Sequence, residues 1–220
     1  MKMNGNSRRQ SLILATTLGI GLGFAFPVFA QQDVRDVGTF ILDLNGKGLI
    51  PLGTLRGSVT KVYDINDVGQ VVGMSTTATG ERHAFITGPN GAGMTDLGTL
   101  GGPYSIATSI NNAGQVVGEA YMDVPGHTHP FITGPNGVGM TDLGPQGEFW
   151  SSATGINNAG QVAANRNPYD PYDFRDHPFI TGPNGVGMTD LNSLVELPAG
   201  TFISQAIGIN NAGQVGDEET

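Results

Sequence analysis

The sequence predicts an all-β protein built from four-stranded antiparallel repeats of about 46 residues, arranged like the blades of a β-propeller. Two phrases recur along the chain at a nearly constant spacing, which indicates a repeat architecture. Asn-Gly and Asn-x-x-Gly turns separate short strand-like runs. Outside residues 1–30, no window has the sustained 3.6-residue apolar period of a helix.

The two phrases alternate with each other. The phrase INxxGQV occurs four times, at residues 65–71, 110–116, 156–162 and 209–215. The second phrase runs from a phenylalanine to a leucine twelve residues later, with the phenylalanines at Phe40, Phe85, Phe131 and Phe179. Successive phenylalanines are 45, 46 and 48 residues apart. Of these copies, the one that starts at Phe40 is the most diverged.

Each unit is predicted to contain four strands, as the copy at residues 98–143 illustrates. SIATSIN alternates small or apolar residues with polar ones and leads through the turn NNAG into QVVGEAY. HPFITG then leads through the turn PNGVG into GMTDLG, which closes the unit. Asn and Gly tolerate the left-handed backbone that tight turns require, so the four strands are expected to form an antiparallel meander.

The units are expected at about residues 31–52, 53–97, 98–143, 144–191 and 192–220, all within one domain. The first contains only the last two strands of a unit, and the last contains only the first two. If these halves met, they would complete a blade and close a ring of four, which removes exposed strand edges. The tail GQVGDEET stops where other copies continue, so an incomplete ring or a truncated member of a longer array is an alternative. A β-solenoid is the alternative architecture.

Residues 1–30 have the pattern of a secretory signal peptide. A basic start precedes an apolar run, and Val28 and Ala30 stand at the −3 and −1 positions of a cleavage site. The run is barely long enough to span a bilayer, so an uncleaved anchor is the alternative. SRRQSL partly matches a twin-arginine export signal. We therefore predict a secreted protein, extracellular or periplasmic, with no membrane insertion after signal cleavage.

Composition excludes several classes of function. Residues 1–30 hold three of the 10 Lys and Arg residues and none of the 19 Asp and Glu residues, which leaves seven cations against 19 acids and a net charge of −12. An acidic surface argues against binding to nucleic acid or to anionic membranes. The chain has no cysteine, which excludes disulfides and thiolate metal or redox sites.

The amino-acid sequence of the repeat units resembles that of a known family. His83, Ala84 and Phe85 open the second phrase, followed by DLGTLGG at residues 96–102 and SIATSINNAGQVVG at residues 105–118. These residues resemble the HAF family of extracellular repeat proteins, and the likeness covers nearly all of residues 38–216. Two copies have proline in place of the alanine, and the first unit lacks the histidine. The resemblance implies a location and a repeat architecture but no reaction.

Three histidines occupy equivalent positions, His83, His129 and His177. They could converge on a propeller axis and bind zinc, copper or nickel, which imidazole suits. The alternative is that each histidine bonds a neighbouring strand or turn in the same structural role, repeated because the blade is repeated. Because the first unit lacks the residue, we favour the structural role.

Calcium is the other metal with a sequence signal. DLNGKG and DINDVG place Asp43, Asp64 and Asp67 in patterns like those of oxygen-ligand loops. However, Lys47 stands where a third acid is expected, and neither stretch has the distant Glu that completes an EF-hand. Asparagine side chains that close their own turns explain these stretches better. We therefore predict no cofactor, with calcium as the weaker alternative.

The chain is not predicted to be an enzyme. It has no Gly-x-Ser-x-Gly elbow, His-Glu-x-x-His motif or phosphate loop. A propeller-type hydrolase acting on glycans is the alternative, since two carboxylates can flank a glycosidic bond. The acids that depart from the repeat are the pool for such a pair: Glu119, Asp123, Glu148, Asp170, Asp173 and Asp176.

Repeat scaffolds commonly bind ligands through the segments that vary between copies. The insertion NRNPYDPYDFRDH interrupts the repeat at residues 165–177, and Trp150 and Tyr104 occupy the same position in two units. The candidate ligand-binding residues are Trp150, Tyr104, Tyr169, Tyr172, Phe174 and Arg175. Aromatic rings beside acids and amides suit sugars or a protein partner. We expect an exported, non-catalytic interaction module that binds a protein or carbohydrate, with a purely structural cell-surface role as a further alternative.

Overall fold

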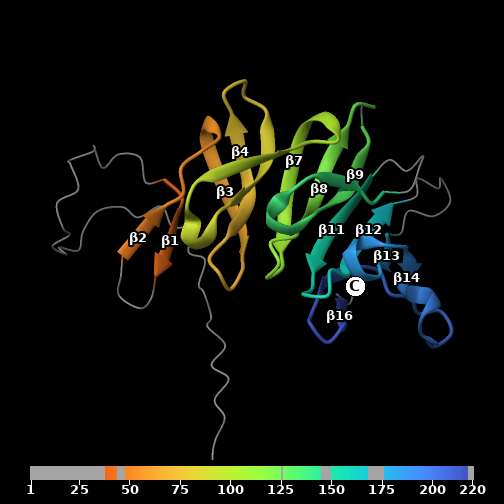
Figure 1. Cartoon of the computed structure of the whole chain (residues 1–220). Coiled ribbons are helices and arrows are strands. Elements are labelled where there is room, and N and C mark those ends of the chain that lie inside the picture. Colours follow the sequence, from red (N-terminus) through yellow and green to blue (C-terminus); the bar gives the residue numbers. More distant parts are fainter. Residues whose placement is uncertain (1–37, 44–47, 125, 145–149, 168–175, 218–220) are drawn as a thin grey trace, which may run out of the picture.

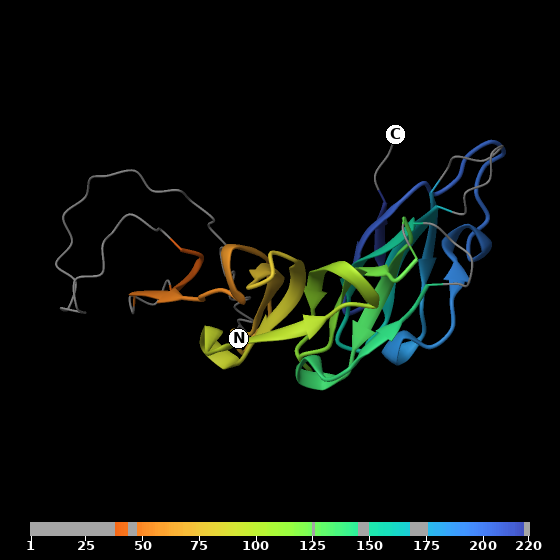
Figure 2. The same ribbon diagram turned by 90° about the horizontal axis from the view of Figure 1, so that it is seen from above.

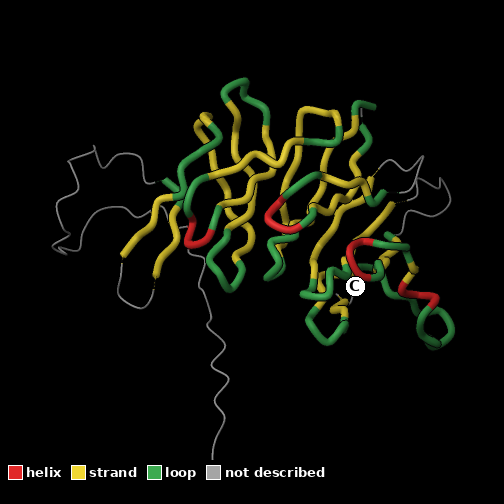
Figure 3. The backbone as a smooth tube through the Cα atoms, viewed as in Figure 1, coloured by secondary structure: helices red, strands yellow, loops and turns green. Residues whose placement is uncertain are grey.

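The computed structural model describes residues 38–43, 48–124, 126–144, 150–167 and 176–217. These residues form an all-β protein, as predicted, with no α-helix among them (Figures 1 and 3). Four three-residue 3-10 turns lie between successive strands: η1 (Pro89–Gly91), η2 (Pro135–Gly137), η3 (Pro183–Gly185) and η4 (Leu191–Ser193). The predicted signal peptide lies outside the described residues.

Three segments of the chain contribute four strands each. The first contains β3 (Arg56–Ile65), β4 (Val71–Thr77), β5 (Arg82–Thr87) and β6 (Met94–Gly98). The second contains β7 (Gly101–Ile110), β8 (Val116–Met122), β9 (Thr128–Thr133) and β10 (Met140–Asp142). The third contains β11 (Trp150–Ile156), β12 (Val162–Asn167), β13 (His177–Ile180) and β14 (Thr189–Asp190). One hairpin stands at each end, β1 (Phe40–Asp43) with β2 (Gly48–Pro51), and β15 (Ala206–Ile209) with β16 (Val215–Asp217).

Within each segment the strands form an antiparallel meander. The register between the second and third strands is the same in all three segments. The second and third strands pair at equivalent residues: Val72 with Ile86, Val117 with Ile132, and Ala163 with Ile180. Neighbouring segments join through single parallel pairs, Arg82 with Tyr104 and Thr128 with Trp150, giving one open sheet of twelve strands. A β-solenoid would instead stack parallel strands along their whole length, so this topology differs from the alternative architecture.

The described strands do not close into a ring. Among them, β1 pairs with β2 alone and β15 with β16 alone, and the two hairpins lie at opposite ends of the array (Figures 1 and 2). A Cβ on Gly91 would meet side-chain carbons of Ile41 and Leu52 within 3 Å, so the first hairpin packs on η1. The buried Ala206 of β15 bonds Asn165 of β12. Each terminal hairpin therefore packs on the segment next to it in the chain. Among the described residues the two hairpins do not combine into a closing blade, which leaves the incomplete ring of the two possibilities.

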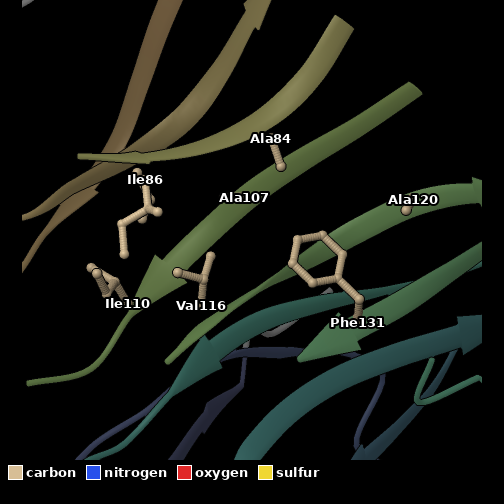
Figure 4. Packing of buried hydrophobic residues seen from close by; sticks show 8 residues of the cluster. Ala84, Ile86, Ala107, Ile110, Val116, Ala120 and Phe131 are labelled. Carbon is tan, nitrogen blue, oxygen red and sulfur yellow. The ribbon is translucent and has the colours of Figure 1, made fainter. Parts of the chain in front are cut away.

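Much of the hydrophobic core lies between successive segments. One buried cluster joins Ile86 of β5 to Ile110 of β7, Val116 of β8 and Phe131 of β9 (Figure 4). The phenylalanines of the second phrase, Phe85, Phe131 and Phe179, are at most 1% exposed. Burying such a side chain contributes about 1.5–3 kcal/mol. The recurrence of this phrase is therefore a recurrence of core positions.

The glycine of each PNG turn inserts between two segments. In η2, Asn136 and Gly137 adopt left-handed backbone angles with φ of +56° and +74°. The N–H of Gly137 donates to the carbonyl of Gly114 at 3.0 Å, which docks the PNG turn on the NNAG turn of its own segment. A Cβ on Gly137 would lie 2.8 Å from Ile86 and Leu97 of the preceding segment. The close approach therefore requires glycine.

A buried asparagine links each INxxGQ turn to the next. The Oδ1 of Asn111 accepts hydrogen bonds from the N–H groups of Ala113 and Gln115. Its Nδ2 donates to Gln115 Oε1 at 2.8 Å and to the carbonyl of Asn157, in the next segment, at 3.1 Å. Asn66 makes the same bonds toward Asn111, and Asn157 makes them toward Asn210. We call this series of contacts the asparagine ladder.

Replacing Gly137 tests the insertion of the PNG turn between segments. Gly139 also has positive φ, at +67°, but a Cβ there meets nothing within 4 Å. Gly139→Ala should therefore cost only the backbone strain, about 1–2 kcal/mol. Gly137→Ala should cost a further ~1–3 kcal/mol, because the added methyl overpacks the contact with Ile86 and Leu97. Urea denaturation gives both values, and equal losses would contradict tight packing at Gly137.

Replacing Asn111 tests the ladder. Asn111→Leu removes the donors that reach Gln115 and Asn157 and leaves buried acceptors unpaired, at about 1–3 kcal/mol for each such group. Asn210→Leu is the matched control, because Asn210 closes the same local turn but is exposed and donates to no further segment among the described residues. We expect a larger drop in unfolding free energy for Asn111→Leu. Equal drops in chemical denaturation would show that the bond between segments contributes nothing.

Candidate functional site

The three histidines each face an aspartate of their own segment. Nδ1 of His83 lies 2.9 Å from Asp96, Nδ1 of His129 lies 3.0 Å from Asp142, and Nδ1 of His177 lies 3.6 Å from Asp190. Each aspartate belongs to the MTDL stretch that follows the PNG turn. The described residues contain no group of three or more His, Asp or Glu side chains placed to hold a metal. The histidines are thus distributed over three segments rather than gathered at one site.

The aspartates that suggested calcium make hydrogen bonds to the next segment. Asp64 accepts from Ser109 Oγ and from the N–H of Ile110, both at 2.9 Å. Asp67 accepts from Asn112 Nδ2 at 2.6 Å. The side chain of Asp43 lies outside the described residues. Donors of the protein itself therefore satisfy Asp64 and Asp67, and calcium binding has no support from their geometry.

Two tyrosines form a ring pair on β7 and β8, which are neighbouring strands in the middle of the sheet. The ring centroids of Tyr104 on β7 and Tyr121 on β8 are 4.9 Å apart, with 51° between the ring planes. The pairing of β7 with β8 is irregular between Gly101 and Ser105, beside this contact. Gly102 leaves room for it, since a Cβ there would lie 2.6 Å from the Cβ of Tyr121. Tyr121 remains 40% exposed.

Trp150 lies in the same cross-strand row as Tyr121. Thr128 of β9 pairs with Tyr121 on one side and with Trp150 on the other. Residues paired across strands project from the same face of a sheet, so the tyrosine and the tryptophan share a face. Trp150 is 46% exposed. The row thus extends the ring pair into the third segment.

Two charged residues and a third tyrosine border the ring pair. Arg82 of β5 pairs directly with Tyr104. Glu119 lies two residues before Tyr121 on β8, so both side chains project from one face, while Ala120 between them is buried. Tyr63 of β3 is exposed and close enough to act electrostatically on Tyr104. We call the set Tyr63, Arg82, Tyr104, Glu119, Tyr121 and Trp150 the aromatic surface.

The carboxyl group of Glu119 is partly withdrawn from water. Burial raises the pKa of Glu119 above the usual range of a glutamate. Burial also raises the pKa of Tyr104, and the negative charge of Glu119 raises it further, while the Arg82 guanidinium acts in the opposite direction. Within the described residues, no cationic side chain forms an ion pair with Glu119. Glu119 is therefore a partly buried carboxylate that forms no ion pair with Arg82, the cation of the aromatic surface.

The sequence identified part of this surface. Trp150 and Tyr104 were predicted to bind a ligand, and the structure connects both to Tyr121 through the row. Tyr121, Tyr63 and Arg82 were missed, and Glu119 was considered only as a catalytic acid. Counting backwards across the NNAG turn would have placed Tyr121 near Tyr104, because Ile110 pairs with Val116. Tyr169, Tyr172, Phe174 and Arg175 lie outside the described residues, as do Glu148, Asp170 and Asp173.

Compared with known proteins, the sequence matches no family model and no curated relative. The resemblance to HAF repeats therefore stays a prediction that rests on the quoted residues. Across the described ranges, no helix has the length and apolar character needed to cross a membrane.

The raised pKa of Glu119 predicts how stability depends on pH. A carboxyl group that binds its proton more tightly in the folded state than in the unfolded state destabilises the fold as pH rises through that range. Glu119→Gln removes this penalty. The variant should therefore gain stability relative to the parent as pH rises from the ordinary range of a glutamate, about 4, toward neutrality.

Urea denaturation of both proteins across this range measures the effect. Glu81→Gln, at an exposed carboxylate, controls for the loss of one negative charge. A difference between Glu119→Gln and the parent that stays constant with pH would contradict the burial of Glu119.

Proposed function

We propose that the protein is an exported, non-catalytic repeat protein that binds a protein or carbohydrate ligand through the aromatic surface. The observation that carries the proposal is the Tyr104–Tyr121 ring pair, with Tyr121 and Trp150 both nearly half exposed in one row. Aromatic side chains provide large contact areas, and Tyr and Trp also offer a polar group to a ligand. Exposed aromatics bordered by polar residues are typical of interaction sites.

The frame beneath this surface suits recognition. The aromatic residues belong to strands rather than to loops, and the asparagine ladder fixes neighbouring segments relative to each other. Sites built on regular elements hold their geometry more accurately than sites built on loops. The sequence pattern of residues 1–30 supports export, and the recurring phrases support a propeller-like packing of the units. In this proposal the propeller-like array is open.

One observation bears on the alternative of a glycan hydrolase. A half-buried glutamate with a raised pKa is the property of a general acid. A glycosidase needs a second carboxyl group across the scissile bond. Burial is the cause of the raised pKa of Glu119, to which no other carboxylate of the described residues contributes. The surface therefore favours binding over hydrolysis.

The single tryptophan of the chain provides the test of binding. Because Trp150 is the only Trp, intrinsic fluorescence reports on the aromatic surface directly. Panels of soluble oligosaccharides and of extracellular proteins should yield a ligand that shifts this emission. Tyr121→Ala should weaken the affinity for that ligand by about 30-fold. This corresponds to the ~2 kcal/mol of binding free energy that is lost when an aromatic residue at the centre of an interface is truncated.

The controls separate loss of binding from loss of fold. Phe202→Ala removes another aromatic ring of similar exposure outside the aromatic surface and should leave the affinity unchanged. Circular dichroism should show the strand content of the parent in every variant. Binding that survives both Tyr121→Ala and Trp150→Ala, the latter followed by calorimetry, would rule out this surface as the binding site.

A further inference from the structure

The class of ligand can be deduced from the charge distribution of the aromatic surface. Glu119 is partly buried beside Tyr121 and is without a cationic partner among the described residues. Arg82, the cation of the surface, pairs with Tyr104 across the strands and forms no ion pair with Glu119. An uncompensated carboxylate in a partly desolvated position is unfavourable in the free protein. A ligand that brings a positive charge to it would relieve this cost.

The arrangement of rings and carboxylate fits a sugar better than a flat protein surface. Glu119 and Tyr121 are two residues apart on one face of β8, which separates their Cα atoms by ~7 Å. A pyranose ring stacked on the tyrosines would therefore present a ring substituent to the carboxylate. The hydroxyl groups of Tyr104 and Tyr121 can meanwhile bond the sugar hydroxyls.

The row also sets a length for the ligand. Trp150 is separated from Tyr104 by three strand-to-strand steps in the order β7, β8, β9 and β11. Three steps correspond to roughly 14 Å along the sheet. A single sugar cannot contact both aromatic residues, whereas an oligosaccharide can. The acidic chain, with a net charge of −9, attracts a cationic polymer over longer distances.

We propose that the ligand is a glycan containing amino sugars, with one pyranose ring stacked on Tyr104 and Tyr121, its ammonium group against Glu119, and a further sugar on Trp150. This inference rests on the proposed binding function and specifies its ligand. The ammonium group supplies the countercharge that Glu119 lacks, and charge-assisted hydrogen bonds of this kind are stronger than neutral ones. An acetylated amino group would keep the stacking contact but lose the charge.

Two matched oligosaccharides test the proposal on the full chain. A glucosamine hexamer and its fully N-acetylated counterpart are titrated at about pH 6 while Trp150 fluorescence is recorded. The parent should bind the glucosamine hexamer at least ~10-fold more tightly, and added salt should reduce this preference. Glu119→Gln should abolish the preference and leave binding of the acetylated hexamer unchanged. Glu81→Gln, which removes an exposed charge outside the aromatic surface, should keep the preference.

Each other outcome overturns the amino-sugar proposal in a recognisable way. Equal binding of the two hexamers, unaffected by Glu119→Gln, would refute the role of the ammonium group but retain a glycan-binding surface. Binding of neither hexamer, together with Tyr121-dependent capture of a defined extracellular protein, would replace the glycan by a protein and retain the proposed function. Absence of every ligand, with Tyr121→Ala indistinguishable from the parent in all panels, would overturn both proposals.

Discussion

The hydrogen bond from the buried asparagine of one INxxGQ turn to the asparagine carbonyl of the next is the interaction on which the array depends. Inside each turn the same side chain accepts from two backbone N–H groups and donates to a glutamine, so every hydrogen-bonding group of its amide is used. A buried amide in this state is costly to replace, because any other side chain leaves unpaired groups. The turn thus fixes both its own conformation and the position of the neighbouring segment.

The other recurring residues support this contact. The PNG turn docks on the INxxGQ turn of its own segment, and its glycine enters the space between Ile86 and Leu97 of the preceding one. The phenylalanines fill the core, and the histidines meet aspartates on the adjoining strand. The repeated motif H-x-FITGPNGxGMTDL is thus explained by packing and hydrogen bonding. Ligand chemistry is better sought where the segments differ, at Tyr104, Tyr121 and Trp150.

Much of the fold was predictable because its signals are local. Alternating side chains and Asn-Gly turns encode strands and hairpins within windows of a few residues, and the described pairings match the expected meander. Half of the aromatic surface was not predictable in this way. Arg82 pairs with Tyr104 from the preceding segment, and no window within either segment marks that contact. Ring closure and an incomplete ring were both compatible with the sequence, and each terminal hairpin packs on its neighbour in the chain.

The sequence by itself determined the strands, the turns, the length of the unit and the residues that depart from it, since each of these depends on neighbours close in the chain. Only the tertiary structure decided which copies touch. The bond from Asn66 to Asn111 spans 45 residues, and the row from Tyr121 through Thr128 to Trp150 crosses from one segment into the next. Such contacts depend on how neighbouring segments pair and pack against one another, and that geometry is set by the whole array rather than by any window of sequence.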